Sequence, residues 1–103
     1  AETIVFNNIK SSIVDKTTYL KADFNNLNTD ILNQLYNRDI LSLIIEGGAI
    51  TINSFIEKNL YDEIRVFTTD KILNKGVNSP ELTNINLIET RMINNDKLEV
   101  YKR

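Results

Sequence analysis

Residues 46–51, Glu-Gly-Gly-Ala-Ile-Thr, have the types and spacing that favour binding of an anionic ligand. They follow an apolar run over 41–45, and a helical pattern begins immediately after the two glycines. A turn between a strand and a helix presents free backbone N–H groups at the positive end of the helix dipole. Adjacent glycines at 47 and 48 would let a phosphate approach the main chain closely, because neither residue carries a Cβ. The alternative is a tight turn with no ligand, in which glycine serves only the backbone conformation.

Glu46 stands at the end of the apolar run, directly before the glycines. A carboxylate at this position can accept hydrogen bonds from sugar hydroxyls, whereas it would repel a neighbouring phosphate. We therefore expect Glu46 to face a sugar rather than a phosphate. The alternative is that its carboxylate satisfies the first N–H groups of the following helix.

Asp62 and Glu63 form a second acidic pair, one helix further along the chain. Paired carboxylates can perform acid–base chemistry. Neighbouring residues of a strand point to opposite faces, however, so these two would not act on one atom. We expect a structural role, in which they bind backbone groups or pair with Arg65.

Hydrophobic periodicity and turn residues define the elements that must position these groups. The pattern predicts strands over 3–6, 17–24, 41–45 and 64–68, helices over 30–38 and 49–58, a polar loop over 69–84, and a hairpin with arms 86–92 and 97–102 that turns near 94–96. Thr29 is the expected cap of the first helix, and Asn59 is the expected stop of the second. The expected apolar faces contain Ile31, Leu32, Leu35 and Tyr36 in the first helix, Ile52, Phe55, Ile56 and Leu60 in and after the second, and Leu98 and Val100 in the last strand.

The run over 41–45 lacks polar alternation, which is typical of a central parallel strand covered on both faces. A helix joins it to 64–68, so the two strands should be parallel with a right-handed crossover. The expected class is α/β: a mixed, mostly parallel sheet with two crossover helices and a C-terminal antiparallel hairpin.

Composition narrows the classes of function. The chain has 103 residues, a net charge of −2 and no histidine or cysteine. Disulfides and thiolate or imidazole metal sites are therefore excluded. The interspersed charges argue against a nucleic-acid surface, and no segment has the roughly 20 apolar residues that span a bilayer. We expect a cytoplasmic protein. Met92 is the lone methionine, and from this we expect a fragment of a longer protein.

The stretch Ile-Ile-Glu-Gly-Gly-Ala, the helix end over 55–60 and the segment Tyr-Asp-Glu-Ile-Arg-Val-Phe over 61–67 resemble one family. It is the reductase domain of the bifunctional riboflavin-biosynthesis deaminase–reductase, which belongs to the dihydrofolate-reductase-like superfamily. The resemblance runs through nearly the whole chain but covers only the C-terminal half of such a domain. Residues 1–103 are thus expected to be the C-terminal part of one reductase domain.

The resemblance implies an NADPH-dependent oxidoreductase that reduces the ribosyl group of a phosphorylated aminopyrimidine. It implies that Glu46 contacts the substrate sugar and that the cofactor diphosphate is held at Gly47, Gly48, Ala49, Ile50 and Thr51. The family more often places threonine one position earlier, where this chain has Ile50. The catalytic residues are not among those identified, and the fragment alone is expected to be nearly inactive.

Two other interpretations stay open. The first is an NADPH-dependent reductase of the same superfamily that acts on a pterin. The second is a non-catalytic α/β module whose sheet edge mediates dimerisation, because exposed sheet edges tend to pair. We expect a homodimer for the riboflavin-biosynthesis reductase as well.

Overall fold

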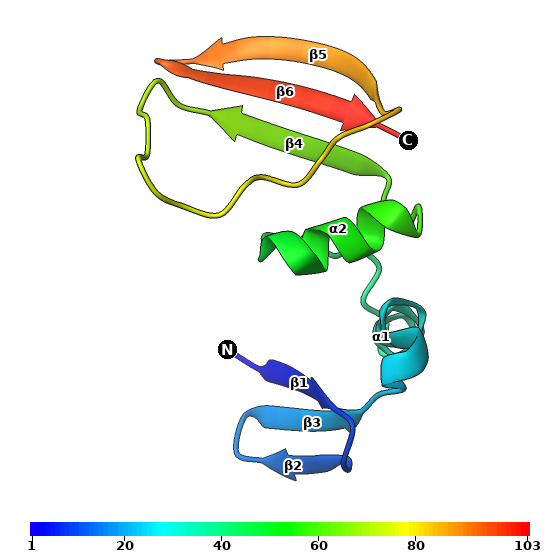
Figure 1. Cartoon of the computed structure of the whole chain (residues 1–103). Helices are drawn as coiled ribbons and strands as arrows, with labels where there is room; N and C mark the ends of the chain where they lie inside the picture. Colours follow the sequence, from blue (N-terminus) through cyan, green and yellow to red (C-terminus); the bar gives the residue numbers. More distant parts are fainter. The chain divides into compact units, whose positions relative to one another are not determined.

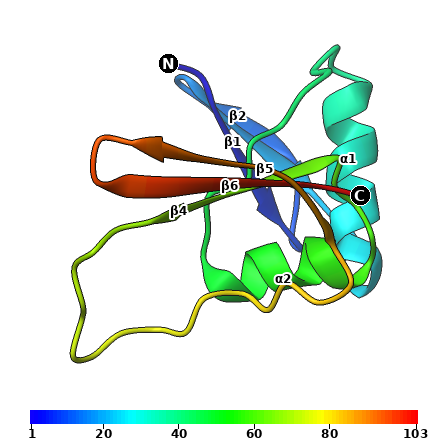
Figure 2. The same ribbon diagram turned by 90° about the horizontal axis from the view of Figure 1, so that it is seen from above.

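The computed structural model describes all 103 residues and divides them into two compact units, Ala1–Ile44 and Ile45–Arg103. Figures 1 and 2 show the chain from two directions. The first unit contains β1 (Thr3–Asn7), β2 (Ser12–Val14), β3 (Thr17–Lys21), a short 3-10 turn (Phe24–Asn26) and α1 (Leu27–Tyr36). The second contains α2 (Ala49–Glu57), β4 (Glu63–Thr68), β5 (Asn86–Ile93) and β6 (Asp96–Lys102).

The sheet of the first unit has the order β1-β3-β2, with β3 in the centre. β1 pairs with β3 in parallel, and β2 pairs with it in the antiparallel sense. A two-residue turn joins β2 to β3, and its first residue, Asp15, has a φ of 52°. Aspartate tolerates this left-handed conformation better than most residues. The strands at β1 and β3 were predicted, whereas the three-residue β2 is too short to give a periodic signal.

α1 begins earlier than its sequence pattern indicates. The Asp23 side chain accepts a hydrogen bond of 3.0 Å from the Asn25 N–H, and the 3-10 turn that follows leads directly into the helix. Thr29 therefore lies inside the helix, and its prediction as the cap is wrong. The helix ends after Tyr36 with the N–H groups of Asp39 and Ile40 donating back to the last turn, as in a Schellman motif.

The predicted central strand over 41–45 is absent. Residues 40–48 have no regular structure, and the side chains of Leu41 and Ile44 are 82% and 83% exposed. A strand exists only when neighbouring strands satisfy its N–H and C=O groups, and no strand of this chain pairs with the segment. The sequence pattern shows that the segment is apolar, but it does not show whether another strand pairs with it.

α2 agrees with the prediction in position and in its apolar face. Phe55 is buried and Ile52 and Ile56 are half-buried. The helix stops as expected at Asn59, which has a φ of 58°. The Leu60 N–H donates to the Phe55 carbonyl at 2.9 Å, and this bond closes a second Schellman motif.

The sheet of the second unit has the order β4-β6-β5 and is antiparallel throughout (Figure 1). The predicted hairpin is confirmed, with a two-residue turn at Asn94–Asn95 in which Asn94 has a φ of 55°. β4 pairs only with β6, so the expected parallel pairing with 41–45 is wrong. The polar loop over 69–85 that joins β4 to β5 is confirmed as irregular.

The α/β class is therefore confirmed, but the mostly parallel sheet is not. The chain forms two three-stranded sheets, and β1–β3 is its one parallel pair. Neither helix is both long enough and apolar enough to cross a bilayer.

The buried apolar side chains are few. They are Leu20, Ala22 and Leu35 in the first unit and Phe55, Leu98 and Val100 in the second. Leu98 and Val100 point to one face of the central strand β6, as predicted. Tyr36, which was expected on the buried face of α1, is 69% exposed because it ends the helix at the surface.

Substitution of one buried and one exposed leucine tests which side chains stabilise the fold. Leu98 is 2% exposed and Leu41 is 82% exposed. We expect Leu98→Ala to lower the free energy of unfolding by about 2–4 kcal/mol, because it removes core contacts and leaves a cavity. Leu41→Ala should change it by less than about 0.5 kcal/mol. Urea denaturation at matched protein concentration measures both. A Leu41→Ala loss as large as that of Leu98→Ala would show that 41–45 is packed as a strand.

Candidate functional site

The two glycines form the turn that leads into α2. Gly47 has a φ of 159°, at the border of the region that side chains disfavour, and the peptide bond between the glycines is cis. Gly48 is the N-cap of α2, with an ordinary extended conformation of φ −71° and ψ −173°. A Cβ added at either glycine would meet no atom within 4 Å. The space beside the turn is therefore open to a ligand.

The first turn of α2 leaves its N–H groups available. Gly48 has no side chain to cap them, and no acidic residue lies in the first turn. The first bond of the helix runs from the Ile52 N–H to the Gly48 carbonyl at 3.0 Å. The N–H groups of residues 49–51 precede that bond, so they are the unsatisfied donors that a helix start presents to an anion.

Glu46, Ile50 and Thr51 are exposed, and Ala49 is half-buried. No hydrogen bond or ion pair to the Glu46 carboxylate is present in the chain, and the capping role considered for it is not seen. The Thr51 carbonyl accepts a hydrogen bond of 2.7 Å from the Ser54 hydroxyl, whereas the Thr51 hydroxyl has no such partner. The six predicted site residues, Glu46 to Thr51, are consecutive in the sequence and all lie at this turn or in the first turn of α2.

The surroundings of this turn differ from the expectation. We predicted a turn that directly follows a strand at 41–45. Because that segment is irregular, the turn connects a loop to a helix, and no strand of the chain ends at it.

Of the second acidic pair, Glu63 has the structural role that we expected, whereas the Asp62 carboxylate makes no hydrogen bond or ion pair in the chain. The Arg65 Nε lies 2.6 Å from the Glu63 Oε1. The Asp62 carbonyl accepts a hydrogen bond of 3.3 Å from the Arg103 N–H, and the Arg103 guanidinium donates to the Asn59 carbonyl at 2.9 Å. The two hydrogen bonds of Arg103 hold this residue against the segment between α2 and β4.

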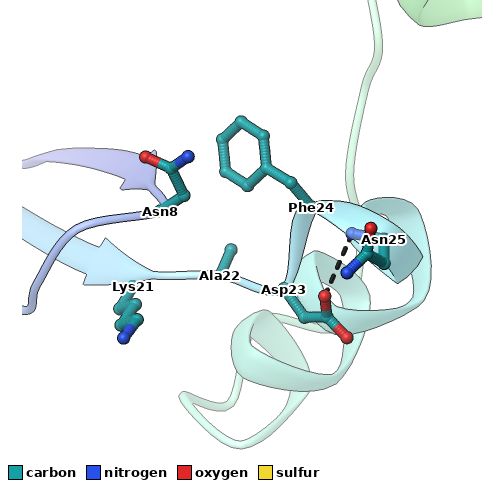
Figure 3. Close-up of a pocket in the computed structure, with 6 residues that line it drawn as sticks. All are labelled: Asn8, Lys21, Ala22, Asp23, Phe24 and Asn25. Carbon is teal, nitrogen blue, oxygen red and sulfur yellow. Dashed lines mark hydrogen bonds between the residues drawn. The ribbon is translucent and has the colours of Figure 1, made fainter.

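Sequence reasoning missed an open hollow of about 570 Å³ in the first unit. Figure 3 shows Asn8 and Phe24 facing each other across it, while Lys21 points away. The hollow is lined by Asn8, Lys21, Ala22, Asp23, Phe24 and Asn25. It lies where the parallel strands β1 and β3 end, a common place for ligands in α/β proteins. The parallel pairing of β1 with β3, which brings the two loops together, was not predicted from the sequence.

A cluster of three polar side chains lies on β6, on the face opposite Leu98 and Val100. The Lys97 ammonium is 2.7 Å from one Glu99 oxygen, and the Tyr101 hydroxyl donates to the other at 2.6 Å. The hydrogen bond from Lys97, and then that from Tyr101, lowers the pKa of Glu99. The same bond to the Glu99 carboxylate raises the pKa of Tyr101. The chain contains no group of three or more acidic side chains that could hold a metal ion.

Single substitutions can separate the two contributions to the Glu99 pKa. Lys97→Met should raise this pKa more than Tyr101→Phe does, because Lys97 makes the larger contribution. A depressed carboxyl pKa stabilises the fold above the unfolded-state pKa, and this contribution is lost as the pH falls through the folded-state pKa. Both variants should therefore lose less stability on acidification. Carboxyl-carbon NMR titration measures the pKa, and a larger effect of Tyr101→Phe would contradict this ranking.

Together these features define a small α/β protein with an uncapped diglycine helix start suited to an anionic ligand. The model of the RibD C-terminal domain family matches residues 2–99, and the chain belongs to this family. It is 31% identical over 70 residues to the riboflavin biosynthesis protein RibD of Aquifex aeolicus (strain VF5), a match that covers 68% of this chain. A crystal structure from Shewanella sp. PV-4, assigned to riboflavin biosynthesis, matches 99% of the chain with a TM-score of 0.70 and 22% identity. The chain spans 20% of the Aquifex protein and 60% of the Shewanella chain.

Proposed function

We propose that this chain is the C-terminal part of an NADPH-dependent 5-amino-6-(5-phosphoribosylamino)uracil reductase of riboflavin biosynthesis. Membership of the RibD C-terminal domain family supports the reductase assignment. The observation that carries the cofactor proposal is the open, uncapped start of α2 at Gly47–Gly48. A dihydrofolate-reductase-like arrangement of the complete domain and a cytoplasmic location belong to the same proposal.

The residues at the start of α2 fit a nucleotide diphosphate. Backbone N–H groups of residues 49–51 would hold the phosphates, with no side chain at Gly48 in the way. The Thr51 hydroxyl is exposed and can donate to a phosphate oxygen. The chain carries a net charge of −2, so the attraction must be local and come from these dipoles. NADPH, when bound, supplies the hydride, and this chain supplies binding and orientation.

Glu46 would bind the sugar of the substrate. Its carboxylate is exposed and makes no hydrogen bond within the chain, so both oxygens are available to accept from hydroxyl groups. Its negative charge beside the phosphate-binding turn would keep the sugar, rather than a phosphate of the substrate, at this position.

Two alternatives remain, as in the sequence analysis. A pterin-type reductase would use the same turn for NADPH and differ only in the substrate. A non-catalytic dimerisation module would bind no cofactor at all, and titration with NADPH separates it from the two reductases.

Gly48→Asp tests the cofactor site. The backbone of Gly48 suits any residue and its surroundings are open, so the variant should fold. An aspartate at an N-cap accepts hydrogen bonds from the first N–H groups of the helix, and its charge repels phosphate. We expect NADPH affinity, measured by nicotinamide fluorescence, to fall at least tenfold.

Gly76→Asp is the matched control, because it makes the same change at another glycine with no atom near its Cβ. It lies in the irregular loop over 69–85 and should retain the affinity of the unsubstituted chain. Equal losses in the two variants, or no binding of NADPH by the unsubstituted chain, would contradict the cofactor site.

The isolated 103-residue chain should oxidise NADPH slowly or not at all when given the aminopyrimidine substrate. The described chain contains the turn and Glu46 but spans only 60% of the Shewanella chain that shares its fold. Absorbance of the reduced nicotinamide measures turnover. Rapid turnover by the isolated chain would show that it holds the complete active site.

A further inference from the structure

A second open hollow, of about 270 Å³, lies in the first unit between the β2–β3 hairpin and the end of α1. It shares no residue with the diglycine turn or with the hollow beside Phe24. The side chains that concern us here are those of Ser11, Ile13, Thr18, Leu20 and Arg38. They combine two hydroxyl groups, two apolar side chains and one guanidinium.

The register of the sheet places the strand residues of this hollow on one face. Ile13 and Thr18 are paired residues of the antiparallel strands β2 and β3, so their side chains lie side by side. Leu20 points to the same face as Thr18, because alternate residues of a strand share a face. Leu20 is 6% exposed, whereas Ile13 is 75% exposed. The hollow therefore has an apolar side that the chain itself leaves partly uncovered.

Ser11 and Thr18 supply hydroxyl groups that can donate to a ligand. The Ser11 Oγ accepts a hydrogen bond of 3.0 Å from the Lys21 N–H, so its own hydrogen is available. The Thr18 hydroxyl makes no hydrogen bond within the chain. No acidic side chain lines the hollow, and Asp39, which follows Arg38, is not part of the lining. An anion would therefore meet donors and no carboxylate.

Arg38 supplies the positive charge. It follows the C-cap of α1, where its N–H donates to the Leu35 carbonyl at 3.0 Å. Its guanidinium makes no ion pair or hydrogen bond in the chain. The Gln34 amide donates to the Lys21 carbonyl at 3.0 Å, and this bond ties α1 to β3, the strand that contains Thr18. A guanidinium held in this way can bind phosphate through two parallel N–H bonds.

These groups suit a phosphate monoester better than a carboxylate. The guanidinium can hold two of the three terminal phosphate oxygens, and the hydroxyls can donate to the third. A carboxylate has only two oxygens and would leave the hydroxyls without a partner. Pockets for drug-sized ligands have volumes of about 300–1,000 Å³. A volume of about 270 Å³ therefore indicates a small ligand.

We propose that this hollow binds the phosphate group of a small phosphorylated metabolite, whose carbon atoms lie against Ile13. The proposal does not depend on the proposed enzymatic function, because the hollow and the diglycine turn belong to different units of the chain. Arg38 is the one cation in the lining, and an exposed ion pair contributes little free energy. Binding of inorganic phosphate should therefore be weak, in the millimolar range.

Titration of the 103-residue chain, followed by the amide NMR shifts, tests the site with three probes. Inorganic phosphate should shift residues 11–13, 18–20 and 38 with one common saturation curve. Propyl phosphate should bind about threefold more tightly, because its carbon atoms cover part of Ile13. Acetate is the carboxylate probe and should bind more weakly than inorganic phosphate.

Substitutions test the two kinds of donor. Arg38→Met should weaken phosphate binding at least about tenfold, because it removes the charge and both parallel bonds. Thr18→Val removes one hydroxyl at nearly constant volume and should weaken binding about threefold. Arg91→Met is the matched control for charge, since Arg91 lies outside this unit. Thr17→Val is the matched control for the hydroxyl, because Thr17 points to the opposite face of β3. Both controls should bind like the unsubstituted chain.

Arg38→Lys separates binding from a purely structural role of Arg38. A cation near the end of a helix stabilises the helix, and lysine and arginine both serve that role. A lysine keeps the charge but lacks the paired N–H groups, so phosphate affinity should fall about threefold while the thermal midpoint stays unchanged. Gly48→Asp, which should block the diglycine turn, should leave the phosphate shifts of residues 18–20 unchanged. A failure of this site can therefore be told apart from a failure of the cofactor site.

The proposal would be overturned by phosphate shifts that do not saturate or that spread evenly over the exposed lysines and arginines. Equal losses in Arg38→Met and Arg91→Met would overturn it too, as would acetate binding as tight as that of phosphate. Circular dichroism checks that each variant is folded. We expect folded variants because Arg38 and Arg91 are exposed and the two threonines are half-buried.

Discussion

The requirement that backbone N–H and C=O groups find partners governs this structure more than any single side-chain contact. Where neighbouring strands meet this requirement, as around β3 and β6, the chain forms two small sheets, and the central strands contain the buried residues Leu20, Leu98 and Val100. Where it is not met, as over 41–45, an equally apolar segment remains irregular and exposed. The apolar character of a segment makes a strand favourable, but pairing decides whether the strand forms.

The diglycine turn shows how much of the proposed cofactor site depends on local structure. Its features depend on residues within one turn of α2: the uncapped N–H groups, the absence of a Cβ at Gly48, and the exposed hydroxyl of Thr51. These features form even though the strand expected before the turn is absent. A site of this kind needs a helix start and little else, because backbone dipoles rather than distant side chains provide the attraction.

The sequence alone determined the features that depend on neighbouring residues. These are the positions of β1, α2 and the C-terminal hairpin, the stop of α2 at Asn59, the pairing of Glu63 with Arg65, and the residues gathered at the diglycine turn. Turn chemistry and periodicity act over a few residues, so a single sequence reveals them. The tertiary structure decided the strand order, the irregular state of 41–45, the exposure of Tyr36 and the hollow beside Phe24. Each of these depends on which distant segments lie side by side, and the free energy of that pairing is not contained in any local pattern.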